Sequence, residues 1–102
     1  MGTISYKIMI TDAIKSIEEN TSLFYQQKNK EAYEMLDNTL ELLIETSNGI
    51  LASQKVKSGL YIDEQELNAI LGNAMNAIEN GDTILLSDIL YFDLKPLLEQ
   101  IS

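Results

Sequence analysis

Residues 82–102 read DTILLSDILYFDLKPLLEQIS, and this stretch decides the fold class. Placed on a helix at about 100° per residue, its apolar side chains cover an arc of roughly 200°, twice the apolar stripe of an ordinary surface helix. They are Leu85, Leu86, Ile89, Leu90, Phe92, Leu94, Leu97 and Ile101. Because so broad an apolar surface must be covered on several sides, the stretch predicts a helix surrounded by other helices.

Two residues in this stretch depart from a plain core helix. Asp93 falls near the centre of the apolar arc, so we expect it to be buried and to accept hydrogen bonds that fix the packing register. Pro96, the only proline, cannot donate to the carbonyl of Phe92, so it predicts a bend or a new short helix from Leu97. An alternative is functional: an acid–base or small-ligand site around Asp93, in a cleft that the proline opens.

Three further segments have the spacing of amphipathic helices, over residues 4–27, 30–57 and 64–80. With a fourth helix over 83–101 and short connections, they predict a single all-α domain over 1–102, an up-down four-helix bundle. The predicted core positions are Ile10, Ile14, Ile17, Thr21 and Phe24, then Tyr33, Leu36, Leu40, Leu43, Ser47 and Ile50, then Leu67, Ile70, Leu71, Ala74 and Ile78.

Boundary signals are clearest around the third helix. Asp63 is predicted to be its N-cap, and Glu66 stands three residues later, as in a capping box. At the other end, Gly81 suits a left-handed C-terminal cap, and Asp82 suits the N-cap of the fourth helix. So short a link predicts that the third and fourth helices form an antiparallel hairpin.

Composition excludes several classes of function. The chain has no histidine, cysteine or arginine, so a catalytic triad, a thiolate nucleophile and an ordinary zinc site are all excluded, and we expect no metal, no cofactor and no enzymatic activity. A net charge of −9 should repel nucleic acid and anionic membranes. The start, MGTISYKIMITD, does not resemble a signal peptide, and we expect a cytoplasmic protein.

Four acidic residues, Glu34, Asp37, Glu41 and Glu45, are spaced to lie on one face of the helix over 30–57. We call this set the acidic ridge. It is either a solvated surface or a docking surface for a basic amphipathic segment. Phe92 belongs to the apolar surface that the three narrower stripes do not fully cover, and a client helix or a second copy of the chain would cover the remainder.

A resemblance enters at the C-terminal residues. The stretch GDTILLSDIL at 81–90, continued by DLKPLL at 93–98, resembles the C-terminal signature of small, uncharacterised helical proteins of clostridia and bacilli. This resemblance implies an association with motility and the flagellum. In general form the chain is also similar to flagellar export chaperones, which are small acidic helical bundles, although their N-terminal motif is missing here.

We therefore expect a bundle that binds another protein, as a chaperone or adaptor connected with flagellar motility. The grooves between its helices would receive the partner, and the acidic ridge would favour a basic one. Two alternatives stay open. One is a self-associating structural protein, such as a homodimer, and the other is the small-ligand or acid–base site around Asp93.

Overall fold

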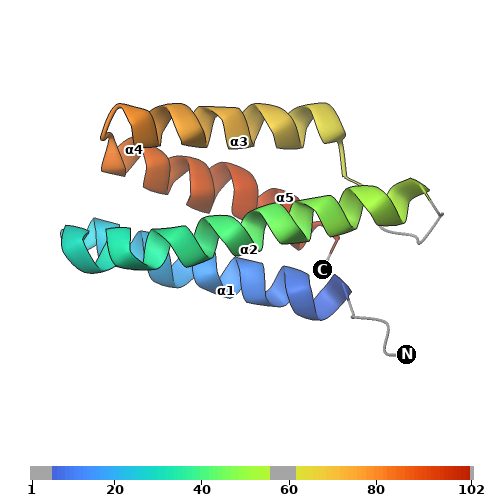
Figure 1. The fold of residues 1–102 in the computed structure, drawn as a ribbon, viewed down its shortest axis with the longest axis horizontal. Helices are drawn as coiled ribbons and strands as arrows, with labels where there is room; N and C mark the ends of the chain where they lie inside the picture. Colours follow the sequence, from blue (N-terminus) through green and yellow to red (C-terminus); the bar gives the residue numbers. More distant parts are fainter. Residues whose placement is uncertain (1–5, 56–61, 102) are drawn as a thin grey trace.

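In the computed structural model, residues 6–55 and 62–101 are described, and they form four helical rods. The bounds are α1 Tyr6–Tyr25, α2 Asn29–Lys55, α3 Glu64–Glu79, and a fourth rod composed of α4 Thr83–Asp88, η1 Ile89–Leu94 and α5 Lys95–Glu99. Successive rods run in opposite directions (Figure 1). The predicted all-α, up-down four-helix bundle is confirmed, and the helix ends predicted at residues 4 and 57 lie outside the described residues.

The four rods do not pack evenly. α1 packs closely against α2 and against all three segments of the C-terminal rod, and α3 packs on α4 and η1. α2 and α3 have no such extensive backbone packing with one another. In Figure 1 the C-terminal rod runs between α3 and the hairpin of α1 and α2. The bundle is therefore held together through α1 and the C-terminal rod, while its α2–α3 side is open.

The core follows from the apolar spacing of the rods. Ile10, Ile17, Thr21 and Phe24 of α1 are buried, and Ile14 is half-buried, as their spacing predicts. The C-terminal rod contributes the most to the core, with Leu86, Ile89, Leu90, Leu94, Leu97 and Leu98 all buried. Each such side chain stabilises the fold by about 1.5–3 kcal/mol when fully removed from water.

On α2 the buried face is rotated from the predicted one. Leu36, Leu43, Ser47 and Ile50 are buried as expected, but Tyr33 is exposed and Leu40 only half-buried. Ala32, Thr39 and Thr46 are buried in their place. The prediction was wrong because it followed the large apolar residues Tyr33 and Leu40 and passed over Thr39 and Thr46.

Two polar contacts with α1 support part of this polar packing, although the Thr46 hydroxyl is buried without a hydrogen-bond partner among the described residues. The hydroxyls of Ser16 and Thr39 lie 2.9 Å apart, and the Asn20 side-chain amide donates to the carbonyl of Ala32 at 3.0 Å. A buried polar group costs little when it has such a partner. The α1–α2 interface therefore turns α2 so that Leu40 and its neighbours face α3.

The predicted boundaries of α3 and α4 are confirmed where the hydrogen bonds show them. The Asp63 carboxylate accepts from the backbone N–H groups of Gln65 at 2.9 Å and Glu66 at 3.2 Å. Gly81 has φ +67°, the left-handed conformation that glycine adopts without strain. Asp82 then caps α4 by accepting from Leu85 N–H at 3.0 Å. The Gly81 and Asp82 conformations end α3 and begin α4 within a few residues, so the chain reverses direction between the two helices.

The C-terminal rod is not a uniform α-helix, and this overturns the predicted burial of Asp93. In η1 the hydrogen bonds join residues five apart, as from Lys95 N–H to the carbonyl of Leu90. Such a π-helical turn holds more residues than an α-helical one, so each residue advances less around the axis. Leu94 consequently reaches the core, whereas Asp93 is exposed and Phe92 is 63% exposed.

Pro96 lies in the first turn of α5, which starts at Lys95 rather than at Leu97. The proline has no N–H with which to continue the hydrogen bonds of η1, and the first helical turn is the position where the missing donor costs least. A new helical segment therefore begins beside the proline, as predicted, but it begins at Lys95 rather than at Leu97.

Candidate functional site

An apolar groove lies between α2 and α3, with a volume of about 200 Å³ and an entirely apolar lining. It exists because α2 is turned toward α3 without packing on it. Its seven lining residues are Leu40, Leu43 and Ile44 from α2, Leu71, Ala74 and Met75 from α3, and Leu90 from η1. We call this the α2–α3 groove.

The floor and the walls of the groove differ in exposure. Leu90 is fully buried and forms the floor, whereas Ile44 is 54% exposed and Met75 is 51% exposed on opposite walls. Leu40 and Ile44 are one turn apart on α2, as Leu71 and Met75 are on α3, so each wall presents a short apolar stripe. Contiguous apolar surface of this kind marks sites of interaction more often than an isolated exposed leucine does.

The acidic ridge borders the α2 wall. Asp37 lies three residues before Leu40, and Glu41 lies three residues before Ile44, so both carboxylates are neighbours of the wall on the helix surface. Glu34 and Glu45 extend the ridge along α2, and all four side chains are exposed. The ion pairs among residues 6–55 and 62–101 join Lys95 to Glu18 and Glu99, not to the ridge.

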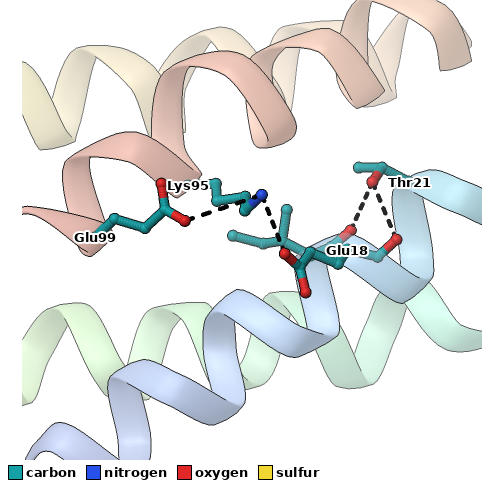
Figure 2. A network of polar contacts seen from close by, with 5 residues as sticks. Glu18, Thr21, Lys95 and Glu99 are labelled. Atoms are coloured by element: carbon teal, nitrogen blue, oxygen red, sulfur yellow. Dashed lines mark hydrogen bonds and ion pairs between the residues drawn. The ribbon is translucent and has the colours of Figure 1, made fainter. Parts of the chain in front are cut away.

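A second polar cluster joins α1 to the C-terminal rod. Figure 2 shows Lys95 between Glu18 of α1 and Glu99 of its own helix, with Nζ–Oε2 distances of 3.0 and 3.9 Å. The same ammonium lies 4.3 Å from the ring centroid of Tyr91, and its hydrogen bond with Glu18 raises the pKa of Lys95. This cluster holds the rod on α1, and sequence reasoning assigned Lys95 no role.

Tyr25 completes this cluster by donating from its hydroxyl to Asp88 Oδ1 at 2.6 Å. A shallow cavity of about 500 Å³ adjoins it, lined by Glu18, Thr21, Ser22, Tyr25, Gln26 and Tyr91. Partial burial of the phenol and the contact with the Asp88 carboxylate raise the pKa of Tyr25 from 10.0 to about 12.

The raised pKa of Tyr25 should make stability depend on alkaline pH. The unfolded phenol loses its proton near pH 10.0 and the folded one only near pH 12, so the stabilisation is complete below pH 10.0 and is lost toward pH 12. We expect Tyr25→Phe to reduce the fall in unfolding free energy across this window, measured by urea denaturation on either side of it. Asp88→Asn should reduce it partly, and an unchanged slope in both variants would contradict the assignment.

The Asp93 region is an open cavity of about 250 Å³ between α3 and the C-terminal rod. It is lined by Glu66, Ile70, Phe92, Asp93, Pro96, Leu97 and Gln100, so the predicted cleft at the proline is present. Asp93 is exposed there instead of being enclosed by neighbouring helices. Its predicted role as a buried packing anchor is therefore wrong.

Because Asp93 faces solvent, Asp93→Leu should change the free energy of unfolding by no more than about 0.5 kcal/mol. Chemical denaturation of both proteins measures this directly. Leu94→Asp, which places a carboxylate at the adjacent buried position, is the matched control and should destabilise strongly. A large loss on Asp93→Leu would mean that the carboxylate has a structural partner.

Among residues 6–55 and 62–101, no three or more acidic, histidine or cysteine side chains converge as metal ligands would. In the same part of the chain, no helix has both the length and the hydropathy needed to cross a membrane.

Comparison with known proteins identifies a family. A family model described as "Domain of unknown function (DUF8042)" matches residues 3–102, nearly the whole chain. The chain belongs to the DUF8042 family. No curated protein and no solved structure matches it. The DUF8042 match gives a domain of unknown function and carries no information on motility or source.

Sequence reasoning identified part of the region around the α2–α3 groove. It placed the acidic ridge on an exposed face, but it assigned Leu40 and Leu71 to the closed core and gave Ile44 and Met75 no role. The available signal was that these two large apolar residues fall outside the predicted seams. Large exposed apolar residues outside the predicted core positions, such as Ile44 and Met75, are therefore candidates for a binding surface in this DUF8042 protein.

Proposed function

We propose that this DUF8042 protein is a non-enzymatic protein-binding module, acting as an adaptor or chaperone, whose α2–α3 groove takes up the apolar face of a helix from another protein. The observation that carries the proposal is the apolar groove itself. Ile44 and Met75 are half exposed on its two walls, above the buried floor at Leu90. A fifth helix laid into it would cover these side chains, as helix-in-groove recognition does elsewhere.

The charge beside the groove argues against a second copy as the occupant. In a symmetric dimer whose two-fold axis runs across the groove, α2 faces the α2 of the second copy, so the two acidic ridges would lie near one another. Like charges brought together at an interface cost several kcal/mol. The protein already carries a net charge of −9, which adds to this repulsion.

The exposed position of Asp93 argues against an acid–base site. A general acid or base with a shifted pKa ordinarily needs burial or a close charged neighbour, and Asp93 faces solvent in an open cavity. We therefore propose a binding function rather than a catalytic one. We also propose a cytoplasmic location, in keeping with a chain that has no cysteine.

A flagellum-associated partner is the narrower form of the proposal. Its support is the resemblance of residues 81–98 to the C-terminal signature named above, and the Leu90 of that stretch forms the floor of the groove. We expect a motility protein to co-purify with the wild-type protein. It should not co-purify with the groove variant Ile44→Ser/Met75→Ser.

The groove is tested with a synthetic amphipathic peptide of roughly 18 residues, long enough to form a helix, with leucines on one face and glutamines elsewhere. NMR titration should move the methyl signals of Ile44 and Met75. The double variant Ile44→Ser/Met75→Ser should weaken binding at least about tenfold, because two apolar contacts are lost.

The matched control is Ile84→Ser/Leu85→Ser, which alters two comparably exposed apolar residues of α4 outside the groove lining. It should bind the peptide as the wild type does. Equal weakening in the two double variants would overturn the proposal, and so would a stable dimer at micromolar concentration in light scattering that Ile44→Ser/Met75→Ser converts to a monomer, which would assign the groove to a second copy.

A further inference from the structure

The two edges of the α2–α3 groove carry different charge. On the α2 edge, Asp37 and Glu41 adjoin the apolar wall, and Glu34 and Glu45 continue the acidic ridge. On the α3 edge, Asn68 precedes Leu71 by three residues and Gly72 precedes Met75 by three, and both are uncharged; Glu79, four residues after Met75, is a carboxylate at the end of this wall. A helix in the groove would therefore meet a row of carboxylates along the α2 edge and a single carboxylate, Glu79, at one end of the α3 edge.

Asp37, Glu41 and Glu45 have no lysine within four residues of them along α2, whereas Lys30 lies four residues before Glu34. No lysine occurs between residues 31 and 54 or between residues 58 and 94. Within the ridge, the carboxylates are three or four residues apart, and like charges at this spacing destabilise a helix by a few tenths of a kcal/mol each. A cationic side chain placed between them would replace repulsion with attraction.

We infer that the helix bound in the groove is amphipathic and basic, with lysine or arginine residues along the edge of its apolar stripe that faces α2, three or four residues apart. This inference rests on the proposed function, because it specifies the partner of the same groove. The apolar stripe would occupy the space above Leu90, while the basic edge would lie along Asp37 and Glu41. Charge complementarity at one edge then sets how the partner helix is rotated about its axis.

Overall attraction must be separated from this local effect, because a protein of net charge −9 attracts any cation. Two synthetic peptides achieve the separation. Both have the same composition and the same leucine stripe. In one, the lysines border the stripe, and in the other they lie on the opposite face of the helix, away from the protein.

At low salt, the peptide with lysines at the edge should bind about fivefold to tenfold more tightly, as expected for a few partly exposed ion pairs. The preference should fall toward equality at high salt, because screening weakens exposed charge pairs. NMR titration of the intact protein measures both affinities and locates each peptide through the methyl signals of Ile44 and Met75.

Isosteric variants test which carboxylates are responsible. Asp37→Asn/Glu41→Gln should abolish most of the preference for the edge peptide. The control Asp12→Asn/Glu19→Gln removes the same charge from exposed positions on α1 and should leave the preference intact. Equal loss in both variants would show that net charge, not the ridge, governs binding.

The outcomes separate this inference from the proposed function. If both peptides move the Ile44 and Met75 signals with equal affinity at low salt, the basic-edge inference is wrong and the groove proposal stands. If neither peptide moves them, the groove proposal fails as well.

Discussion

Replacement of Leu90 by alanine is expected to lower the free energy of unfolding by about 3 kcal/mol, a large effect for the truncation of one side chain. Leu90 is fully buried in η1 and forms the floor of the α2–α3 groove. Its truncation removes buried methyl groups and leaves a cavity that the surrounding helices can only partly fill. Urea denaturation followed by circular dichroism measures the loss.

The control for Leu90→Ala is Leu85→Ala, in the same C-terminal rod. Leu85 is 47% exposed, so its truncation should cost less than about 1 kcal/mol. The groove gives a second measurement, because Leu90→Ala deepens its floor and should alter the affinity for peptides with a bulky apolar anchor. Similar losses of stability in the two variants would contradict the observed burial of Leu90 and the exposure of Leu85.

Alanine at the two glycines of the α3 hairpin should change stability in opposite directions. Gly81→Ala should destabilise the protein by about 1 kcal/mol, because Gly81 has φ +67° and a side chain there is strained. Gly72→Ala should instead stabilise it by up to about 1 kcal/mol. Gly72 is inside α3, and an added Cβ would meet no atom within 4 Å.

These two substitutions form a matched pair, because both add one methyl group to the same hairpin. Thermal and urea unfolding of the two variants beside the wild type give the sign of each effect. A stabilising Gly81→Ala would mean that the turn after α3 does not need the left-handed conformation. A destabilising Gly72→Ala would mean that another part of the chain packs against that position.

The sequence predicts the fold class well because the signals for it are local. The spacing of Ile10, Ile17 and Phe24 identifies one buried face, and Asp63 and Gly81 mark the ends of α3 through hydrogen bonds and backbone conformation. None of these signals depends on how distant helices are arranged.

The candidate site could be predicted only in part, for two physical reasons. The rotation of α2 places Thr39 and Thr46 in the core, positions that a pattern of large apolar residues omits, and the Thr39 hydroxyl lies within hydrogen-bond distance of Ser16. The burial of Asp93 was derived from a constant 100° per residue, and the π-helical turn does not keep to it. The groove itself depends on the separation of α2 and α3, which no local pattern contains.

The widened turn of η1 bears on how the chain tolerates insertions and deletions. Loss of one residue from an α-helix normally rotates everything after it by about 100° and ruins the packing. Here, deletion of Asp93 would remove the surplus residue of η1 and leave Leu94, Leu97 and Leu98 on the core side. Pro96 would then lie inside a regular helix, where it costs about 3 kcal/mol, so the deletion should be tolerated only together with Pro96→Ala. In evolutionary terms, the additional residue and the proline should be gained or lost together.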